Sequence, residues 1–135
     1  MSVIEWQPAF SVLVVRFDEQ HKKLFNLINE LHSAMQRGEG QVVLGGVFQS
    51  LADYTKTHFA DEERMMEANG YPDILRHKAA HEYLIGRIME LQKEFIEGNG
   101  VLSVAVLHFL RDWLTTHIQG EDKKYGRFFN AKGLF

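Results

Sequence analysis

Apolar side chains recur along this chain at alternating intervals of three and four residues, the spacing that places them on one face of a helix. The clearest run comprises Ile74, His77, His81, Leu84, Ile88, Leu91 and Phe95. Such stripes predict helices over residues 18–37, 41–68, 72–97 and 101–119, with a short C-terminal helical segment after them. Because short connections make neighbouring helices antiparallel, the fold class we expect is all-α, an up-down-up-down antiparallel four-helix bundle.

Individual residues mark the ends of these helices. Asp18 suits the N-cap position of the first helix, and Gly38 ends that helix. Gly70 can adopt the left-handed conformation that ends the second helix. Pro72 suits the first turn of the third helix, which we expect to continue to residues 98–100.

The first 17 residues precede the helical pattern and form an N-terminal arm. Their apolar run at residues 12–15 could be mistaken for a strand, but the sequence offers no second strand-like segment to pair with it. We therefore expect an extended arm packed over the bundle. The length supports one core and no linker interrupts it, so residues 1–135 are interpreted as a single domain.

Two histidines, His77 and His81, stand inside the apolar stripe of the third helix, and His58 and Glu62 occupy the stripe of the second. Side chains four residues apart on a helix point the same way. An unpartnered carboxylate is strongly disfavoured in a protein interior, so Glu62 among buried histidines indicates a bound cation. The pattern predicts a metal centre inside the bundle.

Three further residues extend this set: His21 on the first helix, and His117 and Asp122 at the end of the fourth. In a regular helix, five residues at about 100° each leave Asp122 roughly 140° around from His117. For both to face the core the helix must widen, and we place a π-type turn at Gly120.

The complete set holds five imidazoles and two carboxylates. Seven ligands are too many for one tetrahedral zinc and suit two metal ions that share two bridging carboxylates. These nitrogen and oxygen donors fit iron, manganese, zinc or copper, and six-coordination with an open position favours iron.

Other polar residues near these positions do not belong to the predicted site. His32 lies eleven residues beyond His21, roughly 16 Å along the helix, which is too far to share a site. His108 falls on a different face from His117. Glu63 points away from the face of Glu62 and is interpreted as a solvated charge.

Composition excludes several classes of function. The sequence has no cysteine, which removes disulfides, thiolate nucleophiles and iron–sulfur clusters. A net charge of -3 gives no basic footprint for nucleic acid or an anionic membrane. No signal peptide or membrane span of about 18 apolar residues is visible, so we expect a cytoplasmic protein without membrane insertion.

Taken together, the motifs resemble those of the hemerythrin family, in particular the bacterial single-domain bacteriohemerythrins, over nearly the whole chain. The matching positions are Trp6 with Ser11-Val12, Asp18-Glu19-Gln20-His21-Lys22, His58-Phe59 with Glu62, Gly70-Tyr71-Pro72, His77-Lys78 with His81-Glu82, and His117-Ile118 with Asp122-Lys123 and Tyr125. The arm departs from the family pattern at Leu13 and Phe17, where a small residue and an isoleucine are expected.

The resemblance implies two iron ions, joined by an oxo or hydroxo bridge, that bind dioxygen reversibly. One iron would be held by His77, His81 and His117, and the other by His21 and His58, with Glu62 and Asp122 bridging them. The iron with fewer histidines would keep a position open for dioxygen.

Reversible binding requires that water be excluded, so an apolar wall should surround that position. The expected wall residues are Leu114, Ile118, Phe25 and Phe59. Supporting groups around the ligands are expected from Tyr54, Trp113 and Tyr125, with Tyr125 a hydrogen-bond donor near Asp122.

Storage or delivery of dioxygen by a monomer, with an oxygen-consuming enzyme as recipient, is the leading hypothesis. An alternative is a diiron oxidase, peroxidase or nitric-oxide-reactive enzyme, although oxygen-activating bundles of the ferritin type use more carboxylate ligands. Another is an oxygen sensor, which would act through a partner because the sequence contains no output module. A metal-free scaffold is the remaining alternative, and metal analysis would identify it.

Overall fold

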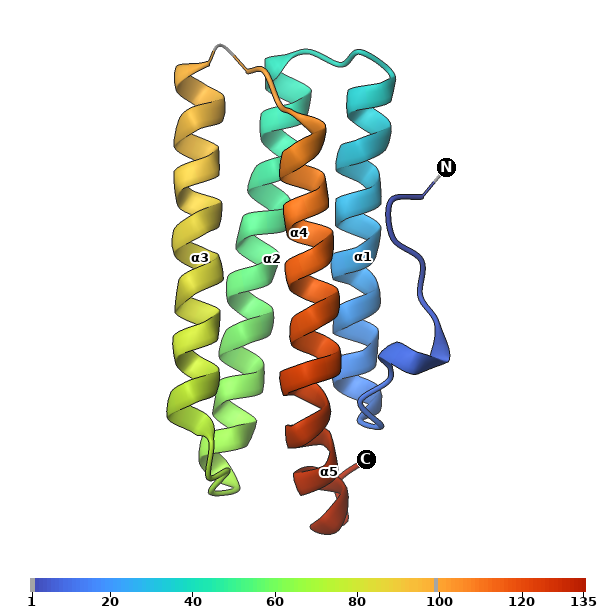
Figure 1. Ribbon diagram of the computed structural model, residues 1–135, viewed down its shortest axis with the longest axis vertical. Helices are drawn as coiled ribbons and strands as arrows, with labels where there is room; N and C mark the ends of the chain where they lie inside the picture. The colour runs from blue at the N-terminus through green and yellow to red at the C-terminus, as the bar shows by residue number, and fades with distance from the viewer. Residues whose placement is uncertain (1, 99) are drawn as a thin grey trace.

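Four long helices lie side by side in the computed structural model, which describes residues 2–98 and 100–135. The helices are α1 (Val15–Gln36), α2 (Gln41–Ala68), α3 (Ile74–Glu97) and α4 (Val104–His117), and a π-helical turn (Ile118–Asp122) joins α4 to the short α5 (Lys123–Ala131). The helices alternate in direction along the chain (Figure 1), which confirms the predicted four-helix bundle. Met1 of the arm and Asn99 of the predicted helix end lie outside the described residues.

Each helix buries the stripe that the apolar spacing indicates. On α3 the buried residues are His77, His81, Leu84, Ile88, Leu91 and Phe95. Removing a large apolar side chain from water contributes about 1.5–3 kcal/mol, so these stripes dominate the stability of the bundle. Among the described helices, none combines the length and the hydropathy that crossing a membrane would need.

The first helix begins earlier than predicted, and Asp18 is not its N-cap. The N-cap is Val14, with extended backbone angles, and Asp18 lies in the first helical turn. The Asp18 carboxylate accepts hydrogen bonds from the Val12 backbone N–H (2.8 Å) and the Ser11 hydroxyl (2.6 Å). The residue therefore ties the arm to α1, a tertiary contact that imitates a capping signal in the sequence.

The third and fourth helices begin later than predicted. Pro72 lies in the turn before α3, whose N-cap is Asp73, and α4 begins after Ser103. The residues before α4 close the end of α3 instead: the Gly100 N–H donates to the Phe95 carbonyl at 2.8 Å. The apolar spacing runs across this connection and therefore does not mark the start of α4.

The arm follows α1 on its outer side (Figure 1) and buries Ile4, Val12 and Val14. The amide of Asn29 on α1 fastens it by donating to the Ile4 carbonyl at 2.8 Å and accepting from the Val3 N–H at 2.9 Å. Leu13 has φ 59°, a left-handed conformation that favours glycine and is unfavourable for leucine.

The predicted widening of the fourth helix is confirmed by the π-helical turn at Ile118–Asp122. Because this turn accommodates the extra residue, His117 and Asp122 are both buried although they are five positions apart. Gly120, where we placed the distortion, lies inside the turn and is exposed.

Candidate metal centre

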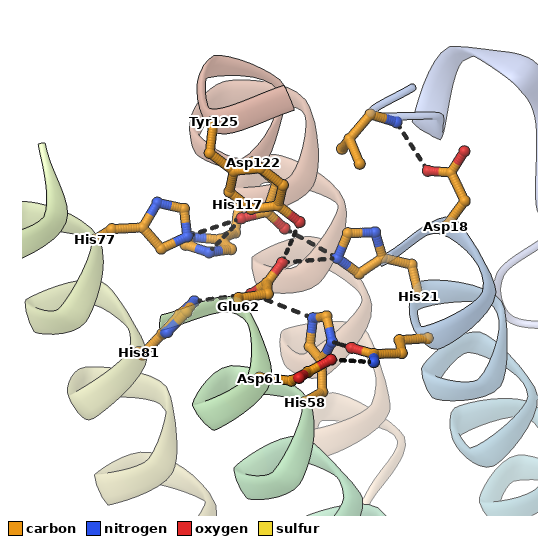
Figure 2. A network of polar contacts seen from close by, with 12 residues as sticks. Asp18, His21, His58, Asp61, Glu62, His77, His81, His117, Asp122 and Tyr125 are labelled. Carbon is orange, nitrogen blue, oxygen red and sulfur yellow. Dashed lines mark hydrogen bonds and ion pairs between the residues drawn. The ribbon is translucent and has the colours of Figure 1, made fainter. Parts of the chain in front are cut away.

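Seven residues with metal-binding side chains converge near one end of the bundle (Figure 2). They form two groups, one of His77, His81, His117 and Asp122 and the other of His21, His58 and Glu62, and within each group the ligand atoms lie within 4.8 Å of one another. All seven are buried. The described residues thus bring together every predicted ligand, while His32 and His108 lie outside both groups.

Asp122 lies between the two groups and offers one oxygen to each. Its Oδ1 is 2.9 Å from His77 Nε2 and 3.0 Å from His117 Nε2. Its Oδ2 is 3.1 Å from Nε2 of His21, in the other group. Asp122 therefore contacts histidines of both groups.

Glu62 also contacts both groups. Its Oε1 lies 3.3 Å from Nε2 of His58 and 3.3 Å from Nε2 of His81. Its Oε2 accepts a hydrogen bond from the Tyr125 hydroxyl. Tyr125 was predicted to be a hydrogen-bond donor near Asp122; it does donate a hydrogen bond in the cluster, and the acceptor is Glu62 on α2.

Seven atoms in this cluster that could bind a metal ion have no hydrogen-bond partner. They are the Nε2 atoms of all five histidines together with Glu62 Oε1 and Asp122 Oδ1. Buried polar atoms normally have a partner, and leaving one without costs about 1–3 kcal/mol. Metal ions would satisfy all of these atoms at once, so the residues present fit a histidine-rich metal centre with nitrogen and oxygen ligands.

The pKa values of the histidines and carboxylates in the cluster depend on one another's charges. Burial alone would lower the pKa of His21, but the carboxylates of Asp122 and Glu62 raise it to about 9. Burial would also lower the pKa of His81, but the carboxylates of Glu62 and Glu63 raise it to about 9. The Glu62 pKa is held well below its usual range despite burial, because His58, His21 and His81 surround it.

Two ligand histidines have hydrogen-bond partners behind the centre. His58 Nδ1 lies 2.5 Å from Gln20 Oε1, and His81 Nδ1 lies 2.8 Å from Glu63 Oε2. Because each partner atom accepts, each Nδ1 carries the proton and Nε2 faces the centre. Interpreting Glu63 as a solvated charge was therefore wrong: its backbone position points away from Glu62, but its side chain reaches across to α3.

Sequence reasoning also missed Gln20, which stands directly before His21 in the motif Asp18-Glu19-Gln20-His21-Lys22. The available signal for its role was its position directly before the ligand candidate His21. Its contact with His58 depends on how closely α1 and α2 approach, which the sequence does not state.

Aromatic rings lie against two of the ligands. Trp113 stacks on His117 with ring centres 4.5 Å apart, and Phe59 stacks on His81 at 3.7 Å. Tyr54 is placed differently from our expectation: the ammonium of Lys23 lies 4.5 Å from its ring centre, and no described hydrogen bond or ring contact joins it to the ligands.

A small apolar cavity of about 20 Å³ lies one helical turn from the cluster, since Leu24, Leu84 and Leu114 in its lining stand three residues from His21, His81 and His117. Its lining consists of Leu24, Ile28, Leu51, Thr55, Phe59, Leu84, Ile88, Leu110 and Leu114. Two of the expected wall residues, Phe59 and Leu114, line it. Ile118 and Phe25 are buried but do not line it. The Phe25 ring packs against the arm instead, with its centre 5.3 Å from that of Phe10.

Comparison with known proteins adds a family context. The model of the Hemerythrin HHE cation binding domain matches residues 12–129. The chain is similar to a bacteriohemerythrin from Methylococcus capsulatus, with 37% identity over 97% of this chain and 100% of the relative. A bacteriohemerythrin from Pseudomonas aeruginosa is 36% identical over 93% of this chain and 80% of its own length. A crystal structure of wild-type hemerythrin is similar with a TM-score of 0.87 and 37% identity, over 93% of this chain and 97% of that one.

Proposed function

Because the chain belongs to the hemerythrin family, we propose that it binds dioxygen reversibly at a non-heme diiron centre and stores oxygen or delivers it to an oxygen-consuming enzyme. The observation that carries this proposal is the set of seven buried donor atoms, five imidazole nitrogens and two carboxylate oxygens, that have no hydrogen-bond partner. Their division into two groups supports two ions rather than one.

In this proposal His77, His81 and His117 hold one iron, and His21 and His58 hold the other. Glu62 and Asp122 bridge the pair. The two oxygens of Asp122, which face His77 and His21 respectively, support the bridging role. The side with two histidines has fewer protein ligands, which leaves room there for a small ligand.

When bound, two ferrous ions can lend electrons to dioxygen and take them back. The chain's contribution is to keep water and external protons away while this happens. Phe59 and Leu114 present hydrocarbon to the cavity, and Trp113 covers one face of His117. The buried Tyr125 hydroxyl keeps its proton on the hydrogen bond to Glu62, since burial and the nearby carboxylates raise its pKa well above the usual value.

The same cavity favours a carrier over an oxidase or peroxidase. A space of about 20 Å³ suits a molecule of a few atoms rather than an organic substrate. Its one polar lining residue, Thr55, already donates its hydroxyl to the Leu51 carbonyl at 2.7 Å. The cavity lining therefore offers no free acid or base.

The proposal is tested by iron analysis and an oxygen titration. Purified protein should contain about two irons per chain, the number that the two ligand groups require. After anaerobic reduction, added oxygen should produce an absorbance band that disappears when oxygen is removed, over repeated cycles. Release of one peroxide per cycle would contradict the carrier function and favour the oxidase, and iron well below two per chain would contradict the centre itself.

A further inference from the structure

A continuous set of polar contacts connects the surface of the bundle to His58. Arg16 and Arg64, both largely exposed, place their guanidinium groups 2.5 Å and 3.1 Å from Oδ1 of the buried Asp61. The other oxygen of Asp61 accepts from Gln20 Nε2 at 2.7 Å. Gln20 Oε1 in turn lies 2.5 Å from His58 Nδ1, and Figure 2 shows Asp61 and His58 close together beside Glu62.

The Gln20 amide has only one workable orientation in this set. A carboxylate can only accept hydrogen bonds, so the NH₂ group of Gln20 must face Asp61. Its carbonyl oxygen is then left for His58, and an oxygen there can only accept. The proton on the His58 ring is thereby assigned to Nδ1.

This assignment matters because a competing partner exists on the other side of the ring. His58 Nε2 lies 3.3 Å from Glu62 Oε1 and has no hydrogen-bond partner. If the ring proton moved to Nε2, it could point at Glu62, and that nitrogen would have no lone pair for a metal ion.

We propose that Asp61, acting through Gln20, is a positioning residue for the metal position on the His21, His58 and Glu62 side. The arginine-anchored carboxylate orients the Gln20 amide, and the amide holds His58 with its Nε2 lone pair toward the centre. This inference rests on the proposed function only in requiring that both metal positions can be filled.

The inference predicts an effect on one metal position and not the other. In the other group, His81 Nδ1 donates directly to a carboxylate oxygen of Glu63 at 2.8 Å and does not depend on Gln20. Disturbing Gln20 or Asp61 should therefore weaken one of two binding events, whereas a general loosening of the bundle would weaken both.

The first test is chelator competition on the full-length chain, emptied of metal and reloaded anaerobically with Fe²⁺. Gln20→Met keeps the length of the side chain and removes both hydrogen bonds. We expect one iron equivalent to bind about 10- to 100-fold more weakly, the range usual for partners behind a metal ligand, and the other to be unchanged. The inference is overturned if the affinities of both iron equivalents fall equally, or if neither affinity falls.

Asp61→Asn tests whether Asp61 acts through Gln20. Asparagine keeps the shape but can donate as well as accept, so the Gln20 amide is free to turn over. We expect a smaller loss at the same metal position. In the Gln20→Met background the Asp61→Asn change should have no further effect, and an equal loss in both backgrounds would exclude the route through Gln20.

A direct readout is the imidazole ¹H–¹⁵N spectrum of the chain loaded with Zn²⁺, a diamagnetic probe. The Nδ1 proton of His58 should exchange slowly with solvent in the wild type and faster in Gln20→Met. The matched controls are Gln49→Met and Asp53→Asn, which alter an exposed glutamine–aspartate pair with a 2.8 Å hydrogen bond near the other end of α2. Neither control should change the iron affinity or the exchange rate.

These outcomes separate the two proposals. A wild-type chain that fails to bind two metal ions defeats the proposed diiron function. A wild-type chain that binds two, with an unchanged affinity and exchange rate in Gln20→Met, defeats only the role of Asp61 and Gln20.

Discussion

Leu114 lies one turn before His117 and lines the small apolar cavity near the cluster. Leu114→Ala should admit water and shorten the autoxidation half-life of the oxygenated protein, since a polar solvent molecule stabilises charge separation at the metal. The truncation should also cost about 2–5 kcal/mol of stability, as usual for a buried leucine. The decay of the oxygenated absorbance band measures the half-life.

Leu31→Ala provides the control for this change, because Leu31 is fully buried on α1 but does not line the cavity. It should lose comparable stability and keep the wild-type half-life. An unchanged half-life in Leu114→Ala, with oxygen affinity intact, would remove Leu114 from the wall.

Glu63 tests the other side of the centre. Glu63→Gln keeps an oxygen near His81 Nδ1 but removes the negative charge that makes the imidazole a stronger donor. Iron bound at the His77, His81 and His117 position should weaken about tenfold, measured by chelator competition. Glu67→Gln on the exposed surface of α2 should have no effect, and the same result for Glu63→Gln would mean that its contact does not influence the metal.

The N-terminal arm and α5 pack directly against each other. Gly126 lies against the backbone of Val12, and a β-carbon at this position would collide with the Val12 carbonyl oxygen. The next residue back, Tyr125, is the hydrogen-bond donor to Glu62. The packing of the arm therefore helps to position a group at the metal centre.

Gly126→Ala should separate the arm from α5 and lower the free energy of unfolding by about 1–3 kcal/mol, as overpacking of a tight contact usually does. Urea denaturation measures this loss. Gly86→Ala on α3, where a β-carbon meets open space, should instead be neutral or stabilising by up to about 1 kcal/mol. A stability loss in Gly86→Ala equal to that in Gly126→Ala would contradict the role of the close contact.

Across the whole molecule, metal loading is coupled to proton release. In the metal-free chain at pH 7 the raised pKa of about 9 keeps a proton on His21, and the same holds for His81. The stabilisation from these protons is fully present below pH 6.5, the unperturbed pKa of histidine, and is lost as the pH rises through 9.

Metal ions bind only the deprotonated nitrogens, so loading at pH 7 should release about two protons per chain, and fewer above pH 9. Calorimetric titration with Zn²⁺ in buffers of different ionisation enthalpy counts them. Release that does not change between pH 7 and pH 10 would contradict the coupling of these histidines to the carboxylates.

Periodicity along the chain was enough to predict the helical architecture and the convergence of the seven candidate ligands, because burial of an amphipathic face follows from local spacing alone. The five-residue interval between His117 and Asp122 even predicted the π-helical turn. The starts of α1 and α4 were predicted less accurately. Asp18 resembles an N-cap, and the apolar spacing is already present before Ser103. Contacts with the arm and with the preceding helix decide where α1 and α4 begin.

Contacts between helices were decided only by the tertiary structure. Gln20 meets His58, Glu63 meets His81, and Tyr125 meets Glu62 across three different helix pairs. Each contact depends on the separation and relative rotation of two helices, quantities that are set by packing of the complete core. A repeat of three and four residues states which face is buried, but it carries no information about what that face will touch.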